Sequence, residues 1–446
     1  MPTSPARVAA FDILLRVEQQ DAYASELLHS DRLDKLEAAD RGLTTELVMG
    51  VLRWQSRLDS VIAANSSRAI AKLDPQVLIA LRIAAYQLLF LTRVPARAAI
   101  FESVELVKRA RKTSAAPFAN AVLRKVADVG PVAQAPSGMA TTASQLAETY
   151  SHPAWLVERW ATHFGLSEAE GICRHDQHVP ATSIRLENAN DSVARELGDA
   201  GITLAPGSLL VSARTVTAGD ITQTRASREG RVFIQDEASQ LVAALVGQGS
   251  RILDCCAAPG SKTAAIAARN PQAKIVAAEL HPHRADLLRR RVRAPNVEVI
   301  TTDATSHHFD ESFDRVLADV PCSGTGTLAR NPEIKWRLKP GDLTDLHKKQ
   351  VAILQAAVQQ LTPAGRVVYS TCSLEAEENE AVVEEVLVQN PACRLIDCRA
   401  ELEAMHKSGE LAVSSIGELL SGPYLRTIPG IYPCDGFFAA IIERLG

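Results

Sequence analysis

The spacing of apolar residues predicts a helical bundle over residues 1–130, where they recur with the period of a helix face and no strand-like alternation is found. Asp74 followed by Pro75 is typical of a helix start, because the aspartate can cap free N–H groups and proline needs no partner in the first turn. The stretch from 75 to 91 is apolar nearly all round. We expect it to be the central helix of the bundle.

The pattern changes after this bundle. Residues 129–144 are rich in Pro, Gly, Ala, Ser and Thr and have no period, which predicts a linker. Residues 145–230 show a mixed pattern that predicts a small α+β module. The elements expected there are helices around 153–164 and 191–199 and strands at 181–187 and 208–213.

From residue 231 to the end, apolar strands alternate with helices, which predicts a parallel sheet buried on both faces. The expected fold class is therefore multidomain: an all-α bundle (1–130), a small α+β module (145–230) and a Rossmann-like α/β domain (231–446). Ligands of such a domain bind at the carboxyl ends of the strands. The strands expected are 231–235, 251–257, 274–279, 297–303, 313–320, 365–373 and 435–443.

Charge is unevenly distributed. The chain of 446 residues carries a net charge of −4 and has 46% hydrophobic residues, as in an ordinary soluble protein. Residues 1–130 hold 18 Lys and Arg against 14 Asp and Glu, a net +4. A basic run within them is either a solvated helix face or a phosphate-contacting patch. Its members are Lys108, Arg109, Arg111 and Lys112.

Eight cysteines show no regular framework and no C-x-x-C pair, which indicates reduced thiols and a cytosolic setting. The N-terminus lacks a secretory apolar segment. The most apolar stretch contains Gln76, Arg82 and Gln87, so it is expected to be a buried helix rather than a membrane span. We expect a cytoplasmic protein that is monomeric and makes no membrane contact.

Three features fall at predicted strand ends. The loop 254–263 (DCCAAPGSKT) opens a helix, and Gly260 lets backbone amides approach a ligand, but the loop lacks the glycines of a dinucleotide site and the Walker spacing. Glu279 is placed to accept hydrogen bonds from ribose hydroxyls, and Asp303 could reach an adenine amino group. This set predicts a nucleoside cofactor without phosphates. S-adenosylmethionine fits, and no metal is expected.

Two further strands end in thiols. One runs into Asp319-Val-Pro-Cys322 and the next into Ser370-Thr-Cys372, so both cysteines should reach the same rim of the sheet. A thiol beside a methyl donor suits pyrimidine C5 methylation, because C5 becomes nucleophilic only when a thiolate adds to C6. Asp319 could hydrogen-bond N3 of the adduct. The alternative is that both cysteines are inert and buried.

A helix is expected to begin at Ser373, directly after Cys372, and its dipole should favour the thiolate. The glutamates of its first turn, Glu375, Glu377 and Glu378, should stabilise the helix but oppose the thiolate.

The segments DCCAAPGSKT, DVPCSGTGTLARNPEIKW and YSTCSLEAEEN resemble those of the Nol1/Nop2/Sun family of RNA cytosine-5 methyltransferases, over about the last 215 residues. The first 130 residues look like a NusB-type RNA-binding domain, on the segments DRGLTTELVMGVLRW, LRIAAYQLLFLTRVP and FANAVLRK. The combination is similar to the bacterial Sun/Fmu branch, which methylates cytosine in 16S ribosomal RNA. The resemblance implies an RNA partner, either 16S rRNA or a partly assembled small subunit.

The resemblance also implies residue roles. Cys372 would be the nucleophile, Cys322 would assist release, and Asp319 would lie near cofactor and base. The family often has Asp where this chain has Glu279, and Gly where it has Ser261. The cofactor residues carried over are Cys256, Ala257, Ala258, Pro259, Gly260, Ser261, Lys262, Glu279, Asp303 and Asp319.

Some assignments stay open. Lys262 could contact the target base or cap its own loop. Trp336, in the run Asn331 to Trp336, could stack on a flipped-out nucleotide or pack in a core.

The alternatives for function are a non-enzymatic NusB-like RNA-binding or antitermination factor and a cytosine-5 methyltransferase acting on tRNA. A DNA cytosine methyltransferase would use Cys322 as nucleophile. An amino-group methyltransferase would need an aromatic residue in the Asp319 loop, which the sequence lacks there.

Overall fold

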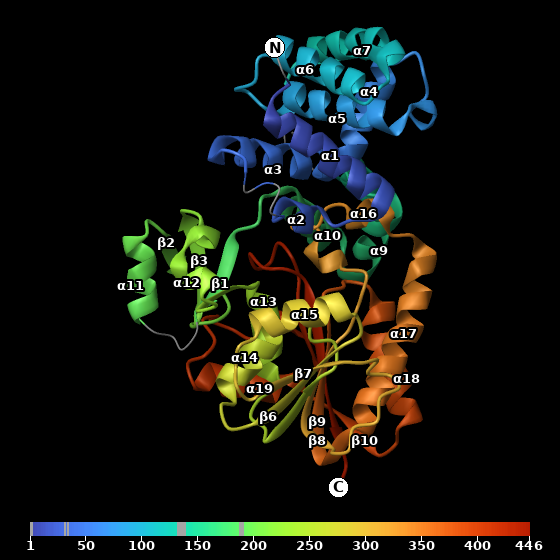
Figure 1. Cartoon of the computed structure of the whole chain (residues 1–446). Helices are drawn as coiled ribbons and strands as arrows, with labels where there is room; N and C mark the ends of the chain where they lie inside the picture. Colours follow the sequence, from blue (N-terminus) through green and yellow to red (C-terminus); the bar gives the residue numbers. More distant parts are fainter. Residues whose placement is uncertain (1–2, 31–32, 34, 132–139, 187–190) are drawn as a thin grey trace. The chain divides into compact units, whose positions relative to one another are not determined.

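The computed structural model describes residues 3–30, 33, 35–131, 140–186 and 191–446. The chain forms two compact units (Figure 1). Unit 1 comprises Met1–Val179 and Leu328–Arg337, and unit 2 comprises Pro180–Thr327 and Leu338–Gly446. The module predicted at 145–230 is thus divided between the units. The predicted linker at 129–144 lies partly outside the described residues.

Unit 1 is helical, as predicted. Its bundle buries one continuous apolar core, and no helix in the described ranges is long and apolar enough to cross a bilayer. The bundle helices are α1 (Pro5–Gln20), α2 (Ala24–Leu28), α3 (Ala38–Arg53), α4 (Gln55–Asn65), η1 (Ile70–Lys72), α5 (Pro75–Phe90), α6 (Ala96–Arg109), η2 (Thr113–Ala115) and α7 (Ala116–Val129).

The predicted central helix is confirmed as α5. Asp74 caps it by accepting the N–H of Gln76, and Pro75 occupies the first position. Most of its residues are buried, because neighbouring helices surround it. Arg82, inside this apolar helix, is neutralised by a bidentate ion pair with Asp59, with N–O distances of 2.7 Å. The charged residue is thereby buried with its partner rather than alone.

Three more helices complete the first part of unit 1: α8 (Ala143–Thr149), α9 (Ala154–Phe164) and α10 (Leu166–Gln177). The helix predicted at 153–164 is therefore confirmed. The second part of the unit is the segment 328–337, which contains the short helix α16 (Ile334–Arg337).

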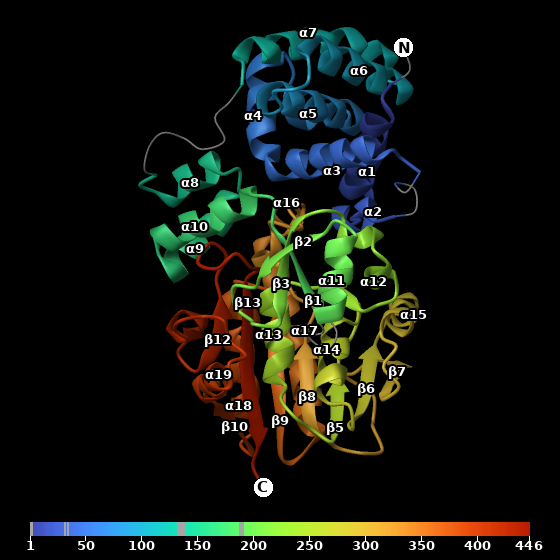
Figure 2. The same ribbon diagram turned by 90° about the vertical axis from the view of Figure 1, so that its left-hand side faces the viewer.

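Unit 2 contains a small four-stranded antiparallel sheet in the order β2-β3-β1-β4, with α11 and α12 beside it (Figure 2). The strand predicted at 181–187 and the helix predicted at 191–199 are confirmed, but the strand predicted at 231–235 pairs in this sheet and not in the large one. The elements are β1 (Thr182–Leu186), α11 (Asp191–Asp199), β2 (Thr203–Pro206), β3 (Ala213–Ala218), η4 (Ile221–Gln223), α12 (Arg225–Arg228) and β4 (Val232–Ile234).

The strand predicted at 208–213 is wrong. Residues 208–212 form a turn in which Leu210 makes an isolated β-bridge to Leu411, and β3 begins only at Ala213. Leu209 and Leu210 are nevertheless buried. The carboxylate of Glu237 accepts the backbone N–H groups of Ser208, Leu209 and Leu210 at 2.7 to 3.2 Å. A buried side chain therefore satisfies the amides that a neighbouring strand would otherwise pair.

The large sheet has the order β11-β12-β13-β9-β8-β5-β6-β7, with β10 paired to β13. The five strands from β7 to β9 are parallel, while β13 runs antiparallel to β9, so the sheet is mixed rather than wholly parallel. Its strands are β5 (Arg251–Asp254), β6 (Lys274–Glu279), β7 (Val297–Thr301), β8 (Phe313–Asp319), β9 (Leu361–Thr371), β10 (Cys393–Ile396), β11 (Leu420–Ser421), β12 (Tyr424–Thr427) and β13 (Phe437–Arg444).

Helices cover both faces of this sheet, which gives a three-layer α/β domain (Figure 1). One core packs α13, α14 and α19 against the sheet, and the other packs α17 and α18 against its opposite face. The remaining elements are α13 (Glu237–Leu245), α14 (Ser261–Arg269), α15 (Pro282–Arg291), η5 (Thr325–Thr327), α17 (Pro340–Gln359), η6 (Ala376–Glu378), α18 (Glu380–Gln389), α19 (Cys398–Lys407) and η7 (Gly417–Leu419).

We expect Glu237→Ala to destabilise unit 2 by about 3 kcal/mol, because it leaves backbone amides of the buried turn without an acceptor. Glu237→Gln keeps one acceptor oxygen and should lose less. Thermal unfolding of the two variants and the wild type checks the order. Equal unfolding temperatures for wild type and Glu237→Ala would contradict this role of the carboxylate.

Candidate active site

A cavity of about 500 Å³ lies at the carboxyl ends of the parallel strands. It brings together residues that the sequence places far apart, from the loop after β5 to the end of β9. Seven of the predicted site residues line it: Cys256, Ala258, Glu279, Asp303, Asp319, Cys322 and Cys372. This is where a doubly wound fold binds its ligand.

The predicted cofactor loop turns sharply into α14. Gly260 has φ +107°, and a Cβ added there would lie 2.7 Å from Val292 and 2.8 Å from Leu288, so no larger side chain fits. Ala257 is buried in the core behind the loop. Pro259 and Ser261 line a neighbouring groove instead of the cavity.

Two predicted acids lie at the cavity wall. Glu279 ends β6, is 4% exposed, and accepts the N–H of His281 at 2.9 Å. Asp303 follows β7 and accepts two hydrogen bonds from Thr305, which hold the pKa of the Asp303 carboxyl below its ordinary value. A buried carboxylate with free acceptor capacity beside a glycine turn suits the ribose of a nucleoside, so these residues fit the predicted cofactor.

Lys262 forms an ion pair with Asp319, with Nζ 2.8 Å from Oδ2, and its Nζ lies 5.0 Å from the centre of the Phe437 ring. Burial opposes the charge on Lys262, but the carboxylate of Asp319 and the nearby Cys372 outweigh it, so the Lys262 pKa lies above its ordinary value. The other oxygen of Asp319 accepts the hydroxyl of Ser370 at 2.7 Å. The sequence had suggested that Lys262 contacts the target base or caps its own loop, and neither interpretation included this ion pair.

The two thiols meet, as the sequence predicted. The sulfur atoms of Cys322 and Cys372 are 3.3 Å apart. Their loops leave adjacent parallel strands at the same level, because Asp319 of β8 pairs with Ser370 of β9. The hydrogen bond to Cys372, together with burial, raises the Cys322 pKa well above its ordinary value, so this thiol holds its proton.

The helix predicted to begin at Ser373 is displaced. The chain instead forms a turn and the 3₁₀ helix η6, and α18 begins only at Glu380. The dipole argument for Cys372 is therefore wrong. The reason is that Ser373 caps no helix: its hydroxyl bonds the buried carboxylate of Glu378.

Glu378, which the sequence placed in the first turn of the predicted helix, has a different role in the structure. It is fully buried, and Oε1 accepts the N–H of Ser323 at 2.8 Å and the amide of Gln350 at 2.9 Å. Oε2 accepts the hydroxyls of Ser323 and Ser373. These serines directly follow Cys322 and Cys372, so one carboxylate ties both cysteine loops together.

The run from Asn331 to Trp336 packs into unit 1. Trp336 donates its indole N–H to the carbonyl of Leu52 at 2.6 Å, and Lys335, 1% exposed, donates to the carbonyl of Arg53 at 3.1 Å. Burial lowers the Lys335 pKa to about 7. The packing interpretation of Trp336 is the one that this arrangement supports.

In the predicted basic run, Lys108 pairs with Glu105 and Lys112 with Asp74. A second basic run, residues 289–293 (RRRVR), also has four basic residues in five positions. The sequence analysis missed it because it forms the end of a predicted helix with no other distinctive feature.

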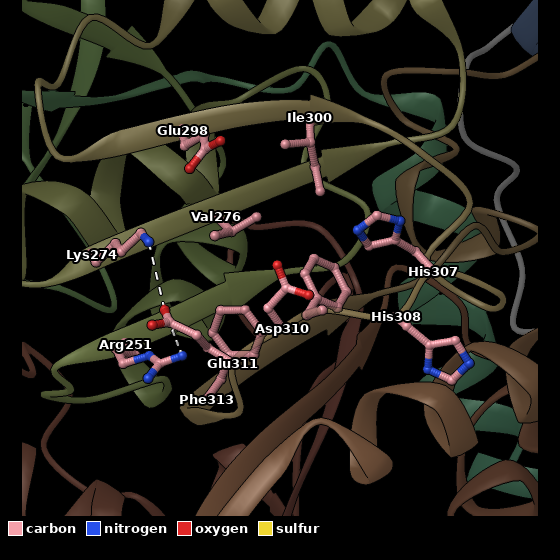
Figure 3. Close-up of a pocket in the computed structure, with 11 residues that line it drawn as sticks. Arg251, Lys274, Val276, Glu298, Ile300, His307, His308, Asp310, Glu311 and Phe313 are labelled. Carbon is pink, nitrogen blue, oxygen red and sulfur yellow. Dashed lines mark ion pairs between the residues drawn. The ribbon is translucent and has the colours of Figure 1, made fainter.

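A second cavity of about 450 Å³ is lined by side chains of β5, β6 and β7 and of the loop before β8. Figure 3 shows Glu311 between Arg251 and Lys274, with N–O distances of 2.7 and 3.6 Å. None of the predicted site residues lines this cavity. The chemistry predicted from the sequence therefore belongs to the cavity at the carboxyl ends.

The fold and the site define a Rossmann-like methyltransferase. The model of the 16S rRNA methyltransferase RsmB/F family matches residues 243–443, and that of the NusB family matches 4–128. The chain is 30% identical to ribosomal RNA small subunit methyltransferase B of Vibrio cholerae over 98% of this chain and 97% of the relative. It is 33% identical to the Pseudomonas putida enzyme of the same name, over 86% and 90%.

Among solved structures, PH0851 superposes with a TM-score of 0.81 at 23% identity, covering 100% of this chain and 99% of that one. NSun6 from Pyrococcus horikoshii gives 0.57 at 18% identity, covering 66% and 98%. Both show likeness of fold. The chain belongs to the RsmB/F family of 16S rRNA methyltransferases, and its cofactor is S-adenosylmethionine.

We expect Glu378→Ala to slow methyl transfer by on the order of 10- to 100-fold, because the two thiols lose their common anchor. Cofactor affinity should stay near that of the wild type, and Glu378→Gln should recover part of the rate. Single-turnover kinetics and cofactor titration separate these effects. A parallel loss of cofactor binding would show that Glu378 serves only the fold.

Proposed function

We propose that this protein methylates C5 of a cytosine in 16S ribosomal RNA through a covalent bond between Cys372 and C6. The observation that carries the proposal is the pair of thiols 3.3 Å apart in the cavity that also holds Glu279 and Asp303. A methyltransferase that modifies a nitrogen needs no thiol, whereas C5 of cytosine needs a nucleophile at C6 before it can react.

In the proposed reaction, the thiolate of Cys372 adds to C6, so that the C5–C6 double bond is lost and an enamine with a C4–C5 double bond forms. N3 takes up the proton of Cys322 in this step. S-adenosylmethionine supplies a methyl group on a positively charged sulfur. C5 then carries both a hydrogen and the methyl group. Cys322, which became a thiolate when it gave its proton to N3, removes the C5 proton, the C6–S bond breaks, and Cys372 leaves as a thiolate. The proton at N3 is then released to water.

Residues around the thiols have distinct tasks in this scheme. The ion pair with Lys262 holds Asp319 in place, and its carboxylate would accept a hydrogen bond from a proton at N3 of the base. Before the reaction, protonated Cys322 donates a hydrogen bond to the sulfur of Cys372.

The choice of 16S rRNA over tRNA rests on the family and on the names of the relatives. The NusB family match over residues 4–128 supports an RNA partner for unit 1.

We expect Cys372→Ala to abolish methyl transfer and Cys322→Ala to accumulate a denaturation-resistant protein–RNA adduct, because release would lack its base. Gel electrophoresis under denaturing conditions detects the adduct on a 16S rRNA transcript. RNA containing 5-fluorocytidine should trap wild-type enzyme through Cys372, identified by mass spectrometry. Absence of this bond would refute the covalent route, and methylation of tRNA but not of 16S rRNA would refute the substrate.

We expect Lys262→Met to slow methyl transfer by on the order of 10-fold, because the carboxylate of Asp319 loses the cation that holds it, with Nζ 2.8 Å from Oδ2. Lys262→Arg keeps the charge and is the matched control. Single-turnover kinetics measure both variants, and equal rates for Lys262→Met and wild type would exclude this positioning role.

A further inference from the structure

A groove of about 310 Å³ in unit 2 is lined by arginines from two separate elements. Arg228 comes from the end of α12 in the small sheet, while Arg290 and Arg291 end α15 and Arg293 follows it. All four are exposed, and no acidic residue lines the groove. We call these four residues the arginine patch.

The arginine patch is not neutralised by the protein. Among the described residues, none of its four members lies within 4 Å of a carboxylate, although arginines around them do. Arg225 pairs with Glu229 at 2.6 Å, and Arg231 pairs with Glu196 at 2.7 Å. The guanidinium of Arg228 bonds only an uncharged group, the carbonyl of Gln223. Four like charges around one groove repel one another, which an anionic ligand would relieve.

The groove adjoins the methyl-transfer site. Pro259 and Ser261 of the cofactor loop form part of its wall. The helix α15, which carries Arg290 and Arg291, is held against this loop, because Leu288 and Val292 occupy the space where a side chain on Gly260 would lie. A ligand on the patch would therefore be bound at a fixed place beside the cofactor loop.

The remaining lining offers apolar surface. Ile234 is 47% exposed, and Arg185 stacks over the ring of Phe233, with 4.5 Å between its guanidinium carbon and the ring centre. Unpaired arginines beside aromatic and apolar side chains match the phosphates and bases of single-stranded RNA. An acidic peptide would also be attracted, but it has no reason to bind beside a cofactor loop.

We propose that the arginine patch binds the phosphate backbone of the RNA substrate next to its target nucleotide. The inference rests on the proposed function in one respect, which is that the substrate is RNA. It assigns the substrate-binding task to unit 2 as well as to the NusB-type helices of unit 1.

The test compares Arg290→Gln/Arg291→Gln with a control that loses two exposed positive charges on α19, Arg399→Gln/Lys407→Gln. Binding of a single-stranded oligoribonucleotide is measured against salt concentration. We expect the patch variant to bind roughly 25-fold more weakly at about 0.1 M salt, with a salt slope smaller by about 1.4, as for two lost phosphate contacts. The control should keep both values.

Cofactor affinity and unfolding temperature should be unchanged in the patch variant, and Arg290→Lys/Arg291→Lys should restore most of the salt slope. Equal salt slopes of RNA binding for the patch and control variants would overturn the inference. That result is also the one expected if the patch binds an acidic polypeptide instead of RNA. If the wild type methylates 16S rRNA but the patch variant has the same salt slope as the control variant, the inference about the patch fails and the proposed function stands. If wild type neither binds nor methylates RNA, both proposals fail.

Discussion

The parallel pairing of β8 with β9 is the constraint on which the site depends. It sets Asp319 beside Ser370, so the loops that follow carry their thiols from the same level of the sheet. Backbone contacts then hold the loops together, since the N–H of Gly326 donates to the carbonyl of Cys372 at 2.9 Å. The sulfur–sulfur distance is therefore set by the sheet and not by flexible side chains, which is what preorganised catalysis requires.

Most of the sheet and its rim were predictable because strands buried on both faces leave contiguous apolar runs, and the acids that follow them stand out. Glu378 was not predictable, since a glutamate within the run EAEEN has the pattern of a solvated helix start. Only the fold shows that Ser323 and Gln350, far away in the sequence, turn toward it. The strand predicted at 208–213 was wrong for the same reason. The carboxylate that accepts the backbone amides there belongs to Glu237, which is too far along the chain for a local sequence pattern to reveal.

The net charge of −4 hides a local division of charge in unit 2. Carboxylates gather around the cavity that would receive a positively charged methyl donor, and unpaired arginines gather in the groove beyond the same loop. Gly260 stands between the two regions, and its missing side chain lets α15 pack against the loop. Composition alone averages these regions to near neutrality, which is why it gave no sign of a nucleic-acid partner.

The segment 328–337 gives the chain an unusual order of assembly. Its ten residues belong to unit 1, yet they follow the whole of the small sheet and four of the nine strands of the large sheet in the sequence. On the ribosome, the carbonyls of Leu52 and Arg53 therefore find their hydrogen-bond donors Trp336 and Lys335 only after about three quarters of the chain has emerged. The N-terminal helices can begin folding first, but they acquire their last partners only late in translation.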